Sequence, residues 1–350
     1  MDASLLDQVA DKVLRESLRV RAGETVTIET WNTGLEFAKR VAVRARRVGA
    51  VPLLLLEDED TFVEGLRQTP KERVGGMGKH ERALLSKSDA YVFVPGPVLG
   101  GSSRLSQKEV AASTAYNSSW YSAAKKAHLR GVRMLFGYVG PELAGILCKP
   151  VDQIVEHQFK AALIDFQQVR HTGLHLSRRL RPGARATLRA GGESLSFELG
   201  AEEGLDDGVV SRHDVATGSN MTNVPPGYYA REIVASSLNG TVRVYAPVPR
   251  IGATGDLRLE FRRGRLVKWQ SETNQQWLDE LVRTTPKDRR AFGAVVIGLN
   301  PILRDGYGQD RLAEGAITLF GMFQGTTQSA DLDVGGKAVV RKGSLTPTTP

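Results

Sequence analysis

The segment Glu24–Leu56 reads ETVTIETWNTGLEFAKRVAVRARRVGAVPLLLL and decides the fold of the first half of the chain. It begins with a β-branched run, Glu24–Thr30, and continues with apolar residues at helical spacing over Leu35–Val48. Gly49 is typical of a helix C-terminus, and the apolar run Val51–Leu56 follows it. This order predicts two strands of one sheet that are connected by a helix.

The same alternation extends to residue 138. We expect, in chain order, a helix at Lys79–Lys87, a strand at Ala90–Val94, a helix at Ser106–Leu129 and a strand at Val132–Tyr138. Four apolar strands separated by helices predict a mostly parallel sheet that is covered on both faces. Residues 1–170 are therefore predicted to form a Rossmann-like α/β domain, with a helix at 151–169 leading out of it.

The second half of the chain has a different pattern, in which pairs of short apolar runs flank glycine or charged turns. Such pairs are typical of β-hairpins, and they are Ala184–Arg189 with Ser194–Leu199, Leu257–Phe261 with Leu266–Trp269, and Ala330–Val334 with Lys337–Arg341. One helix is expected at Asn274–Thr284. The fold class is therefore α/β, with a strand-rich α+β domain at 171–345 and a disordered Thr/Pro tail at 346–350.

The net charge of +8 favours anionic partners. The densest basic stretch, His171–Arg189, has little aromatic interleaving, so the stacking pattern of single-strand binders is absent and no nucleic-acid partner is expected. Cys148 is the only cysteine, which excludes an intramolecular disulfide and a cysteine-rich metal site. No apolar run is long enough to cross a bilayer, and Met1–Arg15 has no signal-like pattern. We expect a cytoplasmic protein with no membrane partner.

A glycine-bearing turn, Pro95–Ser103, follows the third predicted strand. Parallel sheets bind ligands at the carboxyl ends of their strands, which makes this turn a candidate ligand loop. Its sequence, PGPVLGGSS, matches neither a dinucleotide fingerprint nor a phosphate loop. A plain connection is the preferred interpretation.

Several motifs occur in a fixed order along the chain. They are Leu18–Val26, Ala45–Pro52, the run NVPPGYY at Asn223–Tyr229 with the later Asn239–Thr241, and the strands Phe292–Pro301 and Gly315–Gly321. In this order they resemble the thermophilic aminopeptidase family of metallopeptidases over most of the chain. The resemblance implies the fold of that family, a Rossmann-like domain followed by a strand-rich domain, and a homodimer.

The residues that the resemblance implies as metal ligands are replaced in this sequence. Tyr228 stands where the family has Glu after Pro-x-Gly, Ala294 stands where it has Glu, and Thr318 lies near the position of a His. The family's closing His-x-Asp has no histidine here, and its candidates are Ser329–Asp331 and Asp331–Asp333. One or two aspartates alone would leave a divalent ion under-coordinated.

The histidines do not restore this site, because none follows residue 213; they are His80, His128, His157, His171, His175 and His213. Tyr228 and the run Gly298–Pro301 are also similar to a related branch, the iron-dependent dihydroxypyridine dioxygenases. The iron-binding His of that branch falls on Ala294, so its ligand is missing too. We therefore expect no metal and no other cofactor.

A cleft shaped for a peptide is what the resemblance implies, and the loss of metal ligands does not remove it. We predict a protein that binds a peptide without hydrolysing it, with cleft walls from the Pro-x-Gly loop and the Asn300–Pro301 turn. The basic charge favours an acidic peptide, such as a precursor or leader peptide of a peptide-modifying biosynthetic pathway. The candidate ligand-binding residues are Asn223, Tyr228, Tyr229, Arg231, Asn300 and Thr318.

Two alternatives stay open. The first alternative is that the turn with Tyr228 and Tyr229 binds no ligand. The second alternative is an enzyme of the same fold. It is either a divergent metallo-aminopeptidase or dioxygenase, or a metal-independent hydrolase that uses His213 and Asp214 beside Arg212. Adjacent residues on a strand point to opposite faces, which argues against that acid–base pair.

Overall fold

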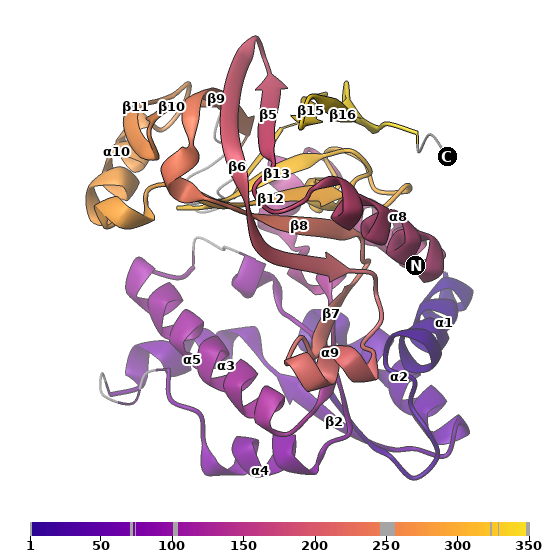
Figure 1. Cartoon of the computed structure of the whole chain (residues 1–350). Helices are drawn as coiled ribbons and strands as arrows, with labels where there is room; N and C mark the ends of the chain where they lie inside the picture. The colour runs from indigo at the N-terminus through magenta and orange to yellow at the C-terminus, as the bar shows by residue number, and fades with distance from the viewer. Residues whose placement is uncertain are drawn as a thin grey trace. The chain divides into compact units, whose positions relative to one another are not determined.

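The computed structural model describes residues 2–70, 73, 75–100, 104–245, 256–322, 324–327 and 329–347. The chain forms two compact units, and each contains two segments of the sequence. The first unit comprises Met1–Leu163 and Gly208–Pro225, and the second comprises Ile164–Asp207 and Pro226–Pro350. A parallel sheet with helices and a large antiparallel sheet are both present (Figure 1), so the predicted fold class is confirmed.

The first unit is built on a five-stranded sheet in the order β2-β1-β3-β4-β7, and every pairing is parallel. Its strands are β1 (Thr25–Trp31), β2 (Val51–Glu57), β3 (Ala90–Val94), β4 (Arg130–Met134) and β7 (Met221–Val224). The sequence pattern did not predict β7, which has four residues and belongs to the segment that returns from the second half of the chain. The expected strand at 132–138 is shorter, because Leu135–Tyr138 form a 3-10 turn.

Helices cover this sheet. They are α1 (Ala3–Lys12), α2 (Leu35–Arg47), α3 (Glu59–Gln68), α4 (Lys79–Lys87), α5 (Gln107–Lys126), α6 (Pro141–Ile146), α7 (Val151–Ala162) and α9 (Arg212–Thr217). The chain crosses from β1 to β2 through α2 and returns to β3 through α3 and α4. Right-handed crossovers therefore place α2 on one face and α3, α4 and α5 on the other.

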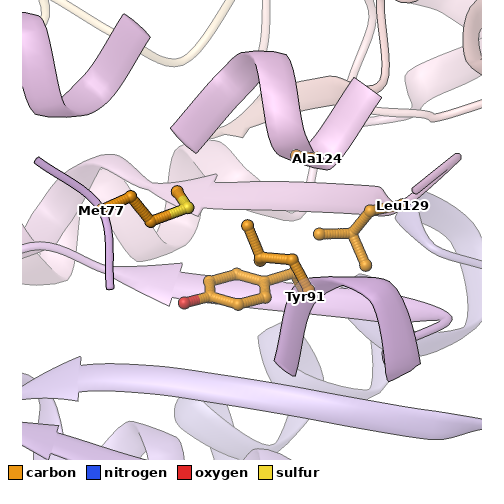
Figure 2. Close-up of a cluster of buried hydrophobic side chains, with 5 residues drawn as sticks. Met77, Tyr91, Ala124 and Leu129 are labelled. Atoms are coloured by element: carbon orange, nitrogen blue, oxygen red, sulfur yellow. The ribbon is translucent and has the colours of Figure 1, made fainter. Parts of the chain in front are cut away.

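The core beneath α4 and α5 is a cluster of buried apolar side chains. In Figure 2, Met77, Tyr91, Ala124 and Leu129 converge on one side of the sheet, and Leu85 belongs to the same cluster. The helix α5 begins with a capping box, since Ser106 accepts from the Glu109 N–H and Glu109 accepts from the Ser106 N–H. These contacts fix α5 against the side of β3 that carries Tyr91.

The order of the strands reverses between β1 and β3, which is where open α/β sheets usually bind ligands. Here the indole of Trp31 occupies that position. It is 2% exposed, lies edge-on to Phe62, and packs with Val98 and Leu105. A Cβ on Gly96 would lie 2.1 Å from the Trp31 ring. The indole thus fills the crevice beside the described part of the Pro95–Ser103 turn; residues 101–103 lie outside the described residues.

The helix expected at 151–169 is two helices, because α7 ends at Ala162 and α8 (Phe166–Arg179) begins after Asp165. The Asp165 carboxylate accepts a hydrogen bond from the Gln167 N–H, which is typical of a helix N-cap. The break lies where the chain passes from the first unit to the second.

The second unit contains a twelve-stranded sheet in the order β11-β10-β9-β14-β13-β12-β8-β6-β5-β15-β16-β17. The strands are β5 (Arg185–Ala190), β6 (Glu193–Asp206), β8 (Tyr228–Ile233), β9 (Asn239–Tyr245), β10 (Asp256–Arg262), β11 (Arg265–Ser271), β12 (Phe292–Gly298), β13 (Ile317–Gly321), β14 (Gln324–Thr327), β15 (Asp331–Val334), β16 (Lys337–Arg341) and β17 (Ser344–Leu345). The three predicted hairpins are present as β5–β6, β10–β11 and β15–β16. The predicted helix is α10 (Gln275–Thr284).

A further pairing of β9 with β6 links strands that lie apart in this order, so that β9, β14, β13, β12, β8 and β6 form a closed ring of paired strands. The strand β6 makes this possible because it is long. Its first half pairs with β5, and after an irregularity between Leu199 and Glu203 its second half pairs with β8. In the predicted tail, the Thr346 N–H donates to the Val339 carbonyl, and residues 348–350 lie outside the described residues.

Candidate functional site

The three positions at which the resemblance implies metal ligands lie on one face of the second unit's sheet. In the strand register Tyr228 is opposite Gly298, Ala230 is opposite Val296, and Val296 is opposite Thr318. Because alternate residues of a strand share a face, one face carries a defined set of side chains. We call this set the Tyr228 face: Tyr228, Ala230, Glu232, Ala294, Val296, Thr318, Phe320, Gln324 and Thr326.

The Tyr228 face is partly accessible. Tyr228, Ala294 and Phe320 are half-buried and Gln324 is exposed. Thr318 is buried, and its hydroxyl forms a 3.0 Å hydrogen bond with the hydroxyl of Thr326. The chemical groups at the three implied ligand positions are therefore a phenol, a methyl group and a hydroxyl that is already engaged.

Tyr229 and Arg231 point to the opposite face of β8, and both are buried. The Tyr229 hydroxyl donates to the Glu203 carboxylate at 2.8 Å, and Arg231 Nη2 donates to the same carboxylate oxygen at 2.6 Å. Ser177 of α8 is a third donor, at 2.7 Å. Arg231 thus pairs with a carboxylate, as the sequence suggested, but this carboxylate belongs to the chain itself.

The pKa of Glu203 reflects these contacts. Burial alone would raise it, but the hydrogen bonds from Ser177 and Tyr229 and the charge of Arg231 together hold it below its usual value. Burial and the bond to Glu203 raise the pKa of Tyr229. The cluster of these four residues connects α8, β6 and β8, and it supports the Tyr228 face from behind.

The Pro-x-Gly loop and the Asn300–Pro301 turn, predicted as two cleft walls, contact each other directly. Asn300 is fully buried, and its amide donates to the Pro226 carbonyl at 2.8 Å. Its side-chain oxygen accepts from the Ile302 and Leu303 N–H groups, both at 3.1 Å. The Leu299 N–H donates to the Gly227 carbonyl at 2.9 Å. The side chain of Asn300 therefore connects the turn to the loop, and both of its polar atoms form hydrogen bonds within the protein.

The acidic residues that the sequence left as metal ligands have partners within the protein. Asp333 forms ion pairs with Arg189 and Arg341, and the Asp331 carboxylate accepts from the Lys342 N–H at 2.7 Å. Burial would raise the pKa of Asp333, but the two arginines lower it. Among the described residues, no group of three or more His, Cys, Asp or Glu side chains is arranged to hold a metal ion.

Sequence reasoning missed a carboxyl pair in the loop between β12 and β13. The Asp310 carboxyl is mostly buried and hydrogen-bonds to Asp305, and it also accepts from the Gly306 and Tyr307 N–H groups at 3.1 and 3.3 Å. Burial and the charge of Asp305 raise the pKa of Asp310 to about 7. Burial raises the pKa of the nearby Tyr245, and the charges of both carboxyls raise it further. In the sequence RDGYGQDR, the only feature that could have indicated this pair is the spacing of Asp305 and Asp310.

Asn223, the remaining predicted site residue, lies in the first unit. It belongs to a row of side chains across the parallel sheet in which Glu29, Phe93, Arg133 and Asn223 are successive neighbours. A cavity of about 30 Å³ lies over this row, and its walls include Glu29, Tyr91, Phe93, Trp120, Arg133 and Met221. Tyr91 donates to Glu29, and burial raises the pKa of Glu29 to about 7.

His213 and Asp214 lie in the short helix α9 and not on a strand. The Asp214 carboxylate accepts from the Ser211 N–H at 2.7 Å, as the second half of a capping box. The carboxylate of Asp214 is therefore used to begin the helix.

No known protein-family model and no curated protein matches the sequence. Solved structures that are similar in fold along their whole length include the following two. Wild-type AmpT from Thermus thermophilus matches with a TM-score of 0.70 and 17% identity over 98% of this chain and 99% of its own. The 2,5-dihydroxypyridine dioxygenase from Pseudomonas putida KT2440 matches with a TM-score of 0.62 and 13% identity over 99% of both chains.

These likenesses confirm the fold that the sequence motifs implied: a Rossmann-like unit and a strand-rich unit, as in AmpT. At identities of 17% and 13% they are likenesses of fold. No helix in the described part of the chain combines the length and the apolarity that a bilayer span needs.

Proposed function

We propose that the protein binds an acidic peptide over the Tyr228 face and does not hydrolyse it. The supporting observation is that Tyr228, Ala294 and Thr318 share one sheet face on three adjacent strands. A phenol, a methyl group and a bonded hydroxyl offer no imidazole, thiolate or carboxylate to a borderline metal. These three residues offer aromatic and apolar contacts together with one bonded hydroxyl, and such contacts suit binding better than metal-assisted hydrolysis.

The preference for an acidic peptide rests on charge. Arg311 lies at the edge of the Tyr228 face, where its guanidinium donates to the Gln324 amide oxygen at 3.2 Å. A guanidinium binds carboxylates with two parallel hydrogen bonds, which gives both affinity and orientation. The net charge of +8 would also speed the approach of an acidic partner. A precursor or leader peptide of a biosynthetic pathway has the required character.

Calorimetric titration of the purified protein with an acidic peptide tests this proposal. We expect saturable binding that is unchanged by a chelator, and a peptide that mass spectrometry recovers intact. Tyr228→Ala should weaken binding by roughly 1–3 kcal/mol, since interface tyrosines contribute this much. Tyr138→Ala, at a half-buried tyrosine of the first unit, is the control and should bind as the wild type does. Equal affinity of both variants would contradict the proposed site.

A metal-independent enzyme is the second candidate, and the Asp305–Asp310 pair favours it. Two carboxyls that share a hydrogen bond, with the pKa of Asp310 raised to about 7, can act as general acid and base. In that case a small substrate or peptide would be turned over in the presence of chelator, and Asp310→Asn would abolish turnover. Unchanged turnover in Asp310→Asn would exclude this pair from the chemistry.

We infer a cytoplasmic location from the cysteine content. Cys148 is the only cysteine of the chain, it is exposed, and it forms no disulfide. Chains without disulfides are typical of reducing compartments. Fractionation of the native host, with detection by antibody, tests this.

A further inference from the structure

The cavity over the parallel sheet of the first unit has a carboxyl group on one side and a guanidinium on the other. Glu29 of β1 and Arg133 of β4 both line it, and in the strand register Phe93 of β3 stands between them. Two strand spacings, about 9–10 Å, therefore separate the two backbones. At about 30 Å³ the cavity has room for roughly two water molecules, since one water needs about 10–15 Å³.

Arg133 lacks the partner that a half-buried arginine normally has. Its Nε is buried and has no hydrogen-bond partner in the described part of the chain. The guanidinium carbon lies 5.6 Å from the ring centre of Tyr121, which also lines the cavity. The face of a ring attracts the cation but does not use the donors in the guanidinium plane. These donors are therefore available to an acceptor in the cavity.

Glu29 lies among groups that favour its neutral form. Tyr91 donates a hydrogen bond to its carboxyl. The other ionisable groups around it are Glu57 at the end of β2, Glu81 of α4 and Tyr116 of α5. Burial, together with the charges of Glu57 and Glu81, raises the pKa of Glu29 to about 7. Below that pH its carboxyl is neutral and can donate a hydrogen bond.

We propose that this cavity binds the carboxylate group of a small ligand, with Arg133 as its cationic partner and the neutral carboxyl of Glu29 as a hydrogen-bond donor. A carboxylate has three heavy atoms and can replace the water molecules. Its plane matches the fork of a guanidinium. A single arginine suits a single negative charge, whereas a phosphate dianion would bring a second one beside Glu29. This site lies in the first unit and does not depend on the proposed peptide binding at the Tyr228 face.

Two probes distinguish the sources of such a carboxylate. Acetate represents a free monocarboxylic acid, and an aspartate that is blocked at both ends represents the side chain of an acidic peptide. Saturable binding of acetate alone would assign a free acid, and binding of both would admit a peptide side chain. Saturable binding of neither probe would overturn the proposal.

The pH dependence of acetate binding tests the role of Glu29. Above a pH of about 7, binding requires the uptake of one proton, because an ionised Glu29 would repel the anion. In calorimetric titrations the dissociation constant should therefore rise about tenfold per pH unit in this range. Glu29→Gln should bind acetate without this dependence. Wild-type affinity that is equal at pH of about 6 and about 8, or higher at the upper value, would overturn the proposal.

Substitution of Arg133 tests the cationic partner. Arg133→Met keeps the apolar stem and should weaken acetate binding roughly 10- to 100-fold, since hydrogen bonds to charged groups are lost. Arg133→Lys keeps the charge without the fork and should lie between the two. Arg47→Met, at an exposed arginine that ends α2, is the control and should bind as the wild type does. Circular dichroism checks that each variant folds. Equal acetate affinity in the wild type and both Arg133 variants, or a preference for methylammonium over acetate, would overturn the proposal.

Discussion

At the scale of single residues, the pair of Arg231 with Glu203 determines how firmly β8 is held. Arg231 has 4% of its side chain exposed, whereas Glu203 has 45%. Removing the carboxylate leaves a buried cation without its counter-ion, so Glu203→Gln should lower the free energy of unfolding by roughly 2–3 kcal/mol in a urea titration. Glu280→Gln breaks an exposed pair with Arg283 and should cost less than about 0.5 kcal/mol. Similar losses in both variants would contradict the assigned role of Arg231.

Glu29 makes the stability of the first unit depend on pH. Burial raises its pKa to about 7 from a usual value of 4.5, so between these values the folded state keeps a proton that the unfolded chain releases. The contribution of this group to stability is therefore complete below pH 4.5 and is lost as the pH rises to 7. Glu29→Gln removes the titration and keeps an acceptor for Tyr91.

Relative to the wild type, Glu29→Gln should gain roughly 1–3 kcal/mol of unfolding free energy between pH of about 4.5 and about 7.5, since one pKa unit corresponds to about 1.4 kcal/mol. Asp310 also has a pKa of about 7, but it is present in both proteins and cancels in the difference. Denaturant titrations at both pH values measure the effect. Parallel pH profiles for the two proteins would show that Glu29 is ionised throughout.

The sequence motifs indicated Tyr228, Ala294 and Thr318 as the positions where metal ligands are replaced, and the structure brings the three onto one face of the sheet. The sequence analysis proposed both Tyr228 and Tyr229 as ligand-binding residues, although they point to opposite faces of β8. The strand period of two contains that information, since neighbours on a strand point to opposite faces. The sequence pattern could not predict the hydrogen-bond partners of Arg231 and Asn300. These partners, Glu203 and Pro226, are distant in sequence and contact the two residues only in the folded sheet.

At the scale of elements, the strand β12 depends on a glycine at its carboxyl end. A Cβ on Gly298 would lie 2.0 Å from the Ala313 carbonyl oxygen, which is backbone and has little freedom to move. Gly298→Ala should therefore displace the β12–β13 loop and destabilise the protein by roughly 1–3 kcal/mol. Gly293→Ala, in the same strand, meets nothing within 4 Å and should be neutral or slightly stabilising. Thermal unfolding of both variants provides the comparison, and equal midpoints would contradict the crowding.

Long elements with strong patterns were predictable, and short ones were not. The predicted α2 and the three hairpins are present because their apolar spacing is repeated over many residues. The strand β7 has four residues and pairs with β4, which precedes it by some ninety positions. No local pattern records such a pairing, so the fifth strand of the parallel sheet appeared only in the structure.

At the scale of the whole molecule, the chain uses the fold found in AmpT and in the dihydroxypyridine dioxygenase with a different set of side chains at the positions of interest. A fold of this kind constrains where a site lies but not what it does. The functional conclusion therefore rests on the residues of the Tyr228 face. Their chemistry predicts binding without metal-assisted hydrolysis.

Elemental analysis of the purified, untagged protein examines this conclusion most directly, with peptide cleavage assayed on the same sample. We expect no stoichiometric zinc, cobalt or iron, and an acidic peptide that stays intact. One metal ion per chain, together with peptide cleavage that stops on chelation and resumes when the ion is returned, would contradict it.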